Sequence, residues 1–526
     1  RLAPGSPEPH NSLGWVLTQL GETDVAIAEL KIAVKLKPDF AQAWMNLASA
    51  LMQKGDAKSA VREAREAVKA APQDSETHRI LGRALSASGD LPGASAEYKS
   101  AIEIEPNRTE LHDDLGSILV QQSKAEEAAA EFNEALKLQP QFPQAHLHLG
   151  VLLLEQNDVA GAERELRAAA ELDPANSLGH YYLAKALESK GANDNALQEF
   201  QYAARLDPVN ADAQKHLGLL LQRSGHADDA VAAFRQVAKI RPESADAHND
   251  LGLALLQIGD AESSIREFGV ALKLKPGDPG YEGNLGAAYL QKTDFDAAVA
   301  HFQAAIKVAP QDATVHYDLG LALKMKDKLP EAIVEFKKAE ELDPKLADAH
   351  YTLGVTLWQQ GEFPAAAEEL RAAIQAKPDY AEAYYTLGSV LKQKGDLQPA
   401  ADALREAIRL QPDFAGAHTN LGAVLRQLGD ADGAAAESRM GLALLQQKSS
   451  EQAAEFATNS GRKLLSAGDI DGAISQFRAA IQSLQAYAPA HYQLALALQR
   501  KGNKQEASKE FERAAEIDPR LKAPGK

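Results

Sequence analysis

Cysteine is absent from the 526-residue sequence, and this one absence excludes several kinds of site. Disulfides, thiolate metal centres and a cysteine nucleophile all need a side chain that the chain does not have. Basic residues are outnumbered: 56 Lys and Arg stand against 74 Asp and Glu, for a formal net charge of −18. Nucleic-acid-binding proteins use a basic surface to displace counterions from phosphates, so nucleic acid is not a predicted partner. No run of about 18 apolar residues occurs, so no membrane-spanning segment is predicted.

Short motifs for catalysis and cofactor binding are also missing. The sequence has no Gly-x-Ser-x-Gly, no His-Glu-x-x-His and no phosphate-binding Gly-rich loop that ends in Lys-Ser or Lys-Thr. We therefore predict no catalytic residues and no cofactor. Residues 430–433 and 469–472 begin like calcium loops, but they lack the full ligand spacing and the closing Glu. Both segments lie where a helix is expected to begin, and Asp is a common N-cap there, so no calcium site is predicted.

What the chain does contain is a repeat, which is clear in Ala347–Tyr380. Apolar residues recur at helical spacing in two stripes, one before and one after Gly361. Gly361 suits the left-handed cap that ends the first helix, and Pro364 suits the first turn of the second. The pattern returns 34 residues later, in 381–414. A helix pair of this length cannot bury its own apolar faces, so each pair must stack on a copy of itself.

With Ala347 taken as position 1, the unit resembles the tetratricopeptide repeat. That family has a large residue at position 4, Leu-Gly at 7 and 8, a large apolar residue at 11, Ala at 20, an aromatic at 24, Ala at 27 and Pro at 32. The matching residues in this copy are His350, Leu353, Gly354, Leu357, Ala366, Leu370, Ala373 and Pro378. Leu370 departs from the aromatic, which other copies restore, as at Phe302 and Phe336. The resemblance implies an all-α, right-handed superhelical α-solenoid of about fifteen helix-turn-helix repeats and close to two superhelical turns.

The repeats fill almost the whole chain. Residues 1–6 are a short lead, 7–448 hold thirteen tandem repeats, 449–453 are an insertion, 454–521 hold two further repeats, and 522–526 form a tail. Little sequence lies outside the repeats, so no appended catalytic domain is predicted. The chain begins at Arg1 and not at Met, which we interpret as the start of a processed or truncated piece.

Two positions of the repeat call for small or permissive residues. Position 8 is Gly or Ala in every copy, which predicts a close approach of the paired helices. Position 15, where the first helix ends, is Gly in most copies. The four exceptions are expected to adopt the left-handed backbone conformation as well; they are Ser123, Asn157, Thr293 and Asp327.

Two stretches depart from the repeat pattern. In residues 275–284, closely spaced Gly and Pro weaken the start of a helix. In the thirteenth repeat, Ser438 replaces the position-24 aromatic, and no proline ends the second helix. We predict that this helix runs on to Lys448 and that Ser449 and Gln452 form a capping box that opens the next helix. The missing ring predicts a gap, which the flexible side chain of Met440 is expected to fill in part.

Ten of the fourteen histidines occupy position 4, which suggests a ladder of metal ligands. Geometry argues against it, because equivalent helices of a stack lie on the order of 10 Å or more apart. Zinc needs its ligands about 2 Å from one centre. Trp44 and Tyr384 occupy the same position, so we interpret the position-4 ring as a packing residue and predict no metal site.

The resemblance also indicates which side chains face a partner. In the tetratricopeptide family the concave side is formed by positions 2, 5, 6, 9, 12 and 13 of each first helix. Position 6 often carries an amide or a carboxylate here, which is similar to the asparagine ladder on the repeat arm of O-GlcNAc transferases. An amide can both donate to and accept from an extended peptide. Thr352 and Thr386 interrupt the ladder, and a merely structural role explains it equally well.

One cluster on consecutive repeats is the predicted peptide-binding groove. Its centre is the run of Tyr317, Tyr351 and Tyr385 at position 5, which has no equivalent elsewhere in the chain. The other predicted groove residues are Asn284, Asp318 and Asn420 at position 6, and Lys324, Trp358 and Lys392 at position 12. Tyr and Trp offer large contact areas at low entropy cost. We predict that an extended peptide binds across residues 313–414 and pairs an acidic residue with one of the two lysines. The alternative is that the tyrosines only tolerate a solvated helix face.

The predicted function is a non-enzymatic scaffold that binds a protein or a peptide whose identity the sequence does not give. Two alternatives stay open: the repeat arm of a larger enzyme such as a glycosyltransferase, and a bacterial envelope assembly or secretion factor. Further sequence after Lys526 would favour the first, and an upstream signal peptide would favour the second. The sequence indicates neither an oligomeric state nor a compartment. A bacterial cytoplasmic location, and a periplasmic or secreted one after loss of a signal segment, both agree with it.

Overall fold

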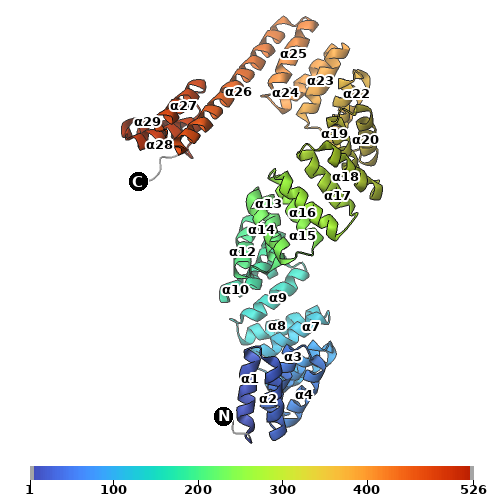
Figure 1. Cartoon of the computed structure of the whole chain (residues 1–526), viewed down its shortest axis with the longest axis vertical. Helices are drawn as coiled ribbons and strands as arrows, with labels where there is room; N and C mark the ends of the chain where they lie inside the picture. The colour runs from blue at the N-terminus through green and yellow to red at the C-terminus, as the bar shows by residue number, and fades with distance from the viewer. Residues whose placement is uncertain (1–4, 522–526) are drawn as a thin grey trace. The chain divides into compact units, whose positions relative to one another are not determined.

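The computed structural model describes residues 5–521, and within that range it contains 29 α-helices and no β-strand (Figure 1). The prediction of an all-α solenoid is thereby confirmed. The predicted lead lies mostly outside the described residues, and the predicted tail 522–526 lies wholly outside them. The chain divides into two compact units, Arg1–Lys275 and Pro276–Lys526, and the division falls within the Gly- and Pro-rich stretch 275–284.

The first unit consists of eight consecutive helix pairs (Figure 1). Its helices are α1 (Pro7–Gln19), α2 (Thr23–Leu36), α3 (Ala41–Gln53), α4 (Ala57–Ala70), α5 (Ser75–Ala87), α6 (Leu91–Ile104), α7 (Thr109–Gln121), α8 (Ala125–Leu138), α9 (Pro143–Glu155), α10 (Val159–Leu172), α11 (Ser177–Ser189), α12 (Asn193–Leu206), α13 (Ala211–Arg223), α14 (Ala227–Ile240), α15 (Ala245–Gln257) and α16 (Ala261–Leu274).

The second unit continues the same alternation of first and second helices (Figure 1). Its helices are α17 (Pro279–Gln291), α18 (Phe295–Val308), α19 (Ala313–Met325), α20 (Leu329–Leu342), α21 (Ala347–Gln359), α22 (Phe363–Ala376), α23 (Ala381–Lys394), α24 (Leu397–Leu410), α25 (Ala415–Leu428), α26 (Ala431–Ser466), α27 (Ile470–Ser483), α28 (Ala488–Lys501) and α29 (Lys504–Ile517).

The two helices of a pair meet where position 8 faces position 24. A Cβ atom added to Gly116 would lie 2.5 Å from the ring of Phe132, and one added to Gly252 would lie 2.6 Å from the ring of Phe268. Both phenylalanines are fully buried. Such contacts leave no space for a larger side chain at position 8, so the predicted close approach is confirmed.

The turns after the first helices have the predicted left-handed backbone. Gly361 has φ of +84°. The four residues that replace glycine at this position also have positive φ: +59° at Ser123, +63° at Asn157, +63° at Thr293 and +60° at Asp327. Asn and Asp tolerate this conformation, whereas Ser and the β-branched Thr adopt it less readily. The turn geometry therefore overrides local preference at Ser123 and Thr293.

Helix α26 joins two repeats that we had expected to be separate. It spans 36 residues and provides both the second helix of the thirteenth repeat and the first helix of the fourteenth. The prediction that Ser449 and Gln452 open a new helix is wrong, because both residues lie inside α26. No Gly or Pro occurs between Gln446 and Ala453, and Gln, Lys, Glu and Ala all favour helix. Nothing in this stretch stops the helix once the repeat has lost its terminating proline.

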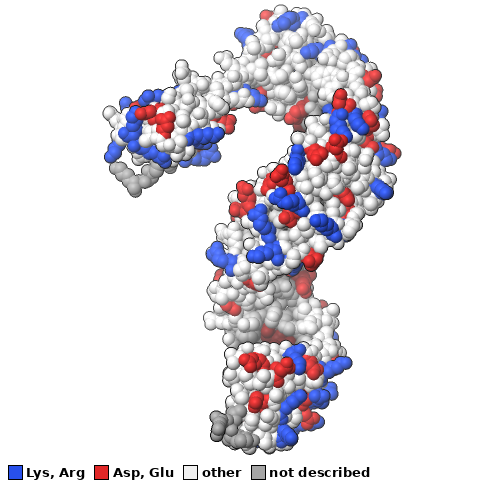
Figure 2. Space-filling view, viewed as in Figure 1, with Lys and Arg blue, Asp and Glu red and all other residues white. Residues whose placement is uncertain are grey.

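The middle of α26 is largely exposed to solvent. Every residue from 445 to 449 is exposed, which is more than one full turn of helix. Met440 is 51% exposed, so the prediction that it fills a gap is wrong. A Cβ atom on Gly422 would lie 2.6 Å from Ser438 Oγ, so α25 and α26 approach closely enough to use the space left by the missing ring. The face of α26 drawn in Figure 2 is largely uncharged.

Candidate functional site

The position-4 histidines form a repeated polar pair with the second helix of their own repeat. In all ten, Nδ1 lies 2.6–2.9 Å from Oε2 of a glutamate 19 residues later, at position 23. In the ninth repeat the two residues are exchanged: His301 Nδ1 contacts Glu282 Oε2 at 2.7 Å. The histidines therefore do more than pack. The signal that the sequence analysis missed was the glutamate at a constant distance of 19 residues.

Side chains at position 5 bond to position 6 of the following repeat. The pairs are Asn11 with Asn46 (2.9 Å), Arg79 with Asp114 (2.6 Å), Asp113 with His148 (2.8 Å) and Lys215 with Asp250 (2.8 Å). Several position-6 groups that resembled a peptide-binding ladder are therefore already bonded within the array. The likeness to O-GlcNAc transferase arms stays a hypothesis.

The three predicted groove tyrosines are half-buried, and each lies against a neighbouring side chain. They also pack against the apolar core of the second unit. Burial raises the pKa of Tyr317 above its ordinary value. The neighbours are Thr352, whose Oγ1 is 3.4 Å from Tyr317 Oη; Tyr380, whose ring centroid is 5.0 Å from that of Tyr351; and Phe414, whose ring centroid is 4.6 Å from that of Tyr385. The tyrosines are thus partly used by the fold, and their remaining surface is exposed.

The polar groove residues of the eleventh to thirteenth repeats form hydrogen bonds across adjacent first helices. Trp358 on α21 donates its Nε1 proton to Gln393 Oε1 on α23 at 2.7 Å. Lys392 Nζ on α23 donates to Asn420 Oδ1 on α25 at 2.6 Å, and Asn420 Nδ2 donates to Ser389 Oγ at 2.9 Å. The structure therefore brings Lys392 and Asn420 together, and Lys392 already has a partner.

Asp318 and Lys324 on α19 differ from the other predicted groove residues. Both are half-buried, and among residues 5–521 neither has a hydrogen bond or an ion pair. Burial, with a smaller effect of Asp312, raises the pKa of Asp318 to about 6. Burial also lowers the pKa of Lys324. Asn284, half-buried on α17, lies one repeat earlier. The two charges on α19 lose hydration without gaining a partner, which is unfavourable unless a ligand supplies one.

Two hollows in the first unit are lined by the same repeat positions, although neither was predicted from the sequence. One, of about 360 Å³, is mostly apolar and is lined by Ser117, Val120, Gln121, Phe132, Leu147, His148, Val151, Leu152, Glu155, Leu178 and Tyr182. The other, of about 530 Å³, is lined by Trp15, Thr18, Gln19, Asn46, Ser49, Met52, Gln53 and Arg83. Apolar residues at positions 5, 9 and 12 of neighbouring repeats were the available signal for the first hollow.

Charge and hydropathy add two observations. On the face drawn in Figure 2, acidic and basic side chains are interspersed, although acidic residues are in excess overall. None of the described helices combines the length and the apolar character that crossing a bilayer requires.

Comparison with known structures returns several helical repeat proteins. One is MamA, with 29% identity over 31% of this chain and 96% of that chain, at a TM-score of 0.31. Another is yeast Tom70, with 16% identity over 80% of this chain and 96% of that chain, at a TM-score of 0.39. A third is PilF of Pseudomonas aeruginosa, with 22% identity over 38% of this chain and 92% of that chain, at a TM-score of 0.35. No curated protein matches the chain.

Family profiles match most of the sequence. One tetratricopeptide repeat profile matches residues 11–75, 114–177, 152–211, 216–279, 351–413 and 385–439, which together exceed half of the chain. Related profiles match 51–118, 286–327, 326–361 and 488–521. Together with the 34-residue helix pairs described above, these matches show that the chain belongs to the tetratricopeptide repeat family of protein-interaction scaffolds.

Proposed function

We propose that this scaffold binds an extended peptide segment of a partner protein on the first helices α19, α21 and α23. The three tyrosines supply the contact area, and the edges of their half-buried rings remain accessible. Asp318 and Lys324 supply the charge recognition. The peptide therefore carries both a basic and an acidic residue, the basic one for Asp318 and the acidic one for Lys324.

The observation that carries this proposal is that the two half-buried charges on α19 have no partner within residues 5–521. The other two aspartates at position 6 are paired within the array, Asp114 with Arg79 and Asp250 with Lys215. A charge that loses water without gaining a partner destabilises the free protein, and a bound peptide relieves this. Lys392 is a weaker anchor than Lys324, because Asn420 already accepts its hydrogen bond.

The test uses random peptides of about twelve residues displayed on phage and selected on the whole chain. Enriched peptides are synthesised, and their affinity is measured by fluorescence polarisation. We expect Lys324→Ala, and the triple change of Tyr317, Tyr351 and Tyr385 to Ala, each to weaken binding by about tenfold or more, the size of a binding hot spot. Affinity should also fall below pH 6, where Asp318 becomes protonated.

Two control variants locate the site. Lys307→Ala changes an exposed lysine on α18 and should leave affinity unchanged. Tyr182→Ala changes the apolar hollow of the first unit and should also have no effect. Peptides that lose affinity with Tyr182→Ala but retain it with the triple change would show that the groove lies in the first unit instead.

A further inference from the structure

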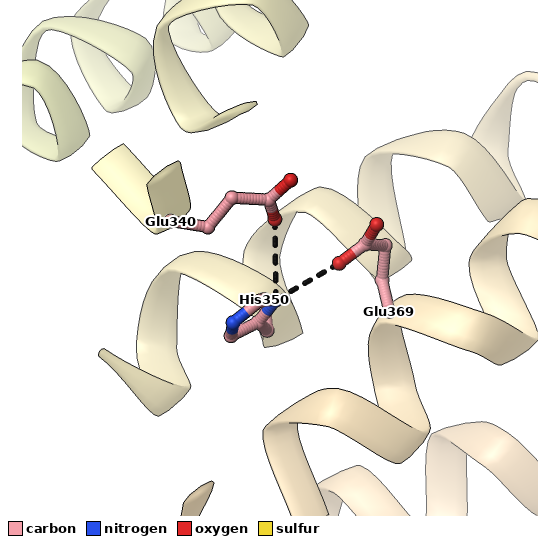
Figure 3. Close-up of side chains that lie close together, drawn as sticks. All are labelled: Glu340, His350 and Glu369. Carbon is pink, nitrogen blue, oxygen red and sulfur yellow. Dashed lines mark hydrogen bonds and ion pairs between the residues drawn. The ribbon is translucent and has the colours of Figure 1, made fainter. Parts of the chain in front are cut away.

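One of the repeated His–Glu pairs carries an additional carboxylate. His350 on α21 contacts Glu369 on α22 like its counterparts, with Nδ1 2.9 Å from Oε2. Glu340, on α20 of the preceding repeat, places its Oε2 3.1 Å from the same nitrogen. Figure 3 shows the three side chains converging on one point from three successive helices. Among residues 5–521, this is the only group of three such side chains whose ligand atoms all lie within 4.8 Å of one another.

Glu340 stands at position 28, where neighbouring repeats have an apolar side chain. The equivalent residues are Ile306 before His316 and Ile408 before His418. Each of these histidines has its usual glutamate at 2.6 Å and, in the part of the chain that the structure describes, no third charged group. The array therefore contains matched sites that differ only in whether position 28 is acidic.

A single proton cannot satisfy this cluster. Nδ1 carries at most one hydrogen, and its hydrogen bond goes to Glu369. Oε2 of Glu340 is buried and has no hydrogen-bond partner in the described part of the chain. A cation in place of the Nδ1 proton would contact all three atoms at once. Ligands about 2.0–2.1 Å from one tetrahedral metal ion are about 3.3 Å apart, and the three ligand atoms here all lie within 4.8 Å of one another.

The imidazole is oriented as a ligating histidine would be. Its Nε2 proton is directed at the backbone carbonyl of Pro344, 3.3 Å away. A histidine that binds a metal through one nitrogen usually donates the other N–H to a carbonyl or a carboxylate, which fixes the ring and frees the ligating lone pair. The side chains of His350, Glu340 and Glu369 are 12%, 20% and 21% exposed. Solvent can therefore supply the remaining ligands.

The charges of the cluster favour a cation. Two carboxylate oxygens lie within 3.1 Å of one imidazole nitrogen, so negative charge is concentrated at this point. With His350 neutral, the two carboxylates carry two negative charges, which a divalent cation would neutralise. One nitrogen and two carboxylate oxygens suit zinc better than calcium or magnesium, which prefer oxygen alone.

We propose that Glu340, His350 and Glu369 form a binding site for one divalent cation of the zinc class. The ion would join α20 of one repeat to α21 and α22 of the next, and would displace one proton from His350 on binding. Binding is then stronger at higher pH, until metal hydroxide forms.

The test is calorimetric titration of the chelator-treated, metal-free chain with zinc chloride at pH 7.5, with cobalt(II) absorption as a second readout. We expect one ion per chain and, from titrations in buffers of different ionisation enthalpy, about one proton released per ion. Glu340→Ile installs the residue that neighbouring repeats carry and should weaken this binding at least tenfold, while the metal-free midpoint of unfolding stays near that of the parent.

A gain-of-site variant makes the test independent of any loss of folding. Ile306→Glu places a carboxylate beside His316 and Glu335 and should raise the stoichiometry to two ions per chain. The proposal is overturned if the parent chain binds no zinc at millimolar concentration, or if Glu340→Ile binds as tightly as the parent. It is also overturned if each His–Glu pair binds zinc equally, which would give many ions per chain.

Discussion

The repeats of α19–α24 and the long helix α26 are built on the same 34-residue frame, but only the former stack without interruption. In the tenth repeat, positions 20, 24 and 27 are the fully buried Ala332, Phe336 and Ala339. In the thirteenth repeat, Ser438 replaces the aromatic, and α26 then continues into solvent. Repeats are stabilised chiefly by their neighbours. The comparison teaches that the loss of one ring and one stop signal fuses two helices into one and weakens the stacking of their repeats, while the chain there stays helical.

The largest expected effect comes from moving the serine of the thirteenth repeat into the tenth. Phe336→Ser removes a fully buried ring that lies against Gly320 and should lower the free energy of unfolding by about 3–5 kcal/mol. The measurement is the urea midpoint, with far-ultraviolet circular dichroism as the signal. An unchanged midpoint would contradict the assignment of position 24 as the centre of each repeat.

The reverse change tests the close approach of α25 and α26. Ser438→Phe should not stabilise the chain, because Ser438 Oγ already lies 2.6 Å from the place that a Cβ on Gly422 would take. The added ring has to push the helices apart, and overpacking of this kind costs about 1–3 kcal/mol. A stabilised variant would show that an open cavity exists there after all.

Hydrogen exchange compares local opening in the two regions. Amides of Ser438–Ala453 should exchange through local openings whose free energy is at least about 2 kcal/mol lower than in Ala313–Phe414, because every residue of the turn 445–449 is exposed. An isolated helical turn is stabilised only by its own hydrogen bonds, which are marginal in water. Equal protection in the two segments would rule out the division of the array at α26.

The regular region was predictable because its signals lie within one repeat. Gly361 and Pro364 mark a turn by themselves, and even the strained Ser123 and Thr293 follow from their place in the frame. The continuity of α26 was not predicted. Ser449 and Gln452 can cap the start of a helix, but they can also lie inside one. Whether the chain starts a new helix or continues the old one depends on helix propensity together with the packing of neighbouring repeats.

In the candidate groove, the sequence predicted which side chains share a face but not which neighbours they contact. The frame predicted the face that carries Tyr317, Trp358 and Lys392, but not their partners. Whether Lys392 meets Asn420 or a ligand depends on the angle between adjacent repeats, which no single repeat specifies. The acidic cluster at His350 was missed for a similar reason, because Glu340 belongs to the preceding repeat and substitutes for an apolar residue.

A further prediction uses pH to weaken the packing around His350. The pKa of His350 is about 10 in the folded chain, against an ordinary value of 6.5, so the folded state binds this proton more tightly. The resulting stabilisation is complete below pH 6.5 and is lost as the pH rises through 10. Raising the pH from 7 to 10.5 in the presence of chelator should therefore lower the free energy of unfolding of α20–α22 by on the order of 1–2 kcal/mol. The difference in stability between these helices and α26 should become smaller.

Fluorescence of Trp358 can follow this effect. Trp358 lies on α21, and the other two tryptophans, Trp15 and Trp44, lie in the first unit and can be replaced by Phe. The control is His350→Gln, which keeps a polar side chain but cannot take up the proton. If the loss of stability between pH 7 and 10.5 is the same in parent and control, the proton on His350 is not its cause.

The smallest expected effect concerns the turns, which can be altered with no change in packing. Thr293 has φ of +63°, a conformation that costs a side chain with a Cβ roughly 1–2 kcal/mol. Glycine relieves this strain but is more flexible in the unfolded chain, so Thr293→Gly should raise the free energy of unfolding by about 1 kcal/mol.

The opposite change is Gly361→Ala, at φ of +84°, where no atom lies within 4 Å of the added Cβ and only backbone strain is introduced. Gly429→Ala, between α25 and α26 with φ of +87°, introduces the same backbone strain next to the interrupted stacking at α26. Gly361→Ala should lower the main urea midpoint, whereas Gly429→Ala should mainly increase local exchange in α26, because its repeat has lost support on one side. Equal shifts of the main midpoint for both variants would mean that α26 couples its repeats as tightly as α21 and α22 do.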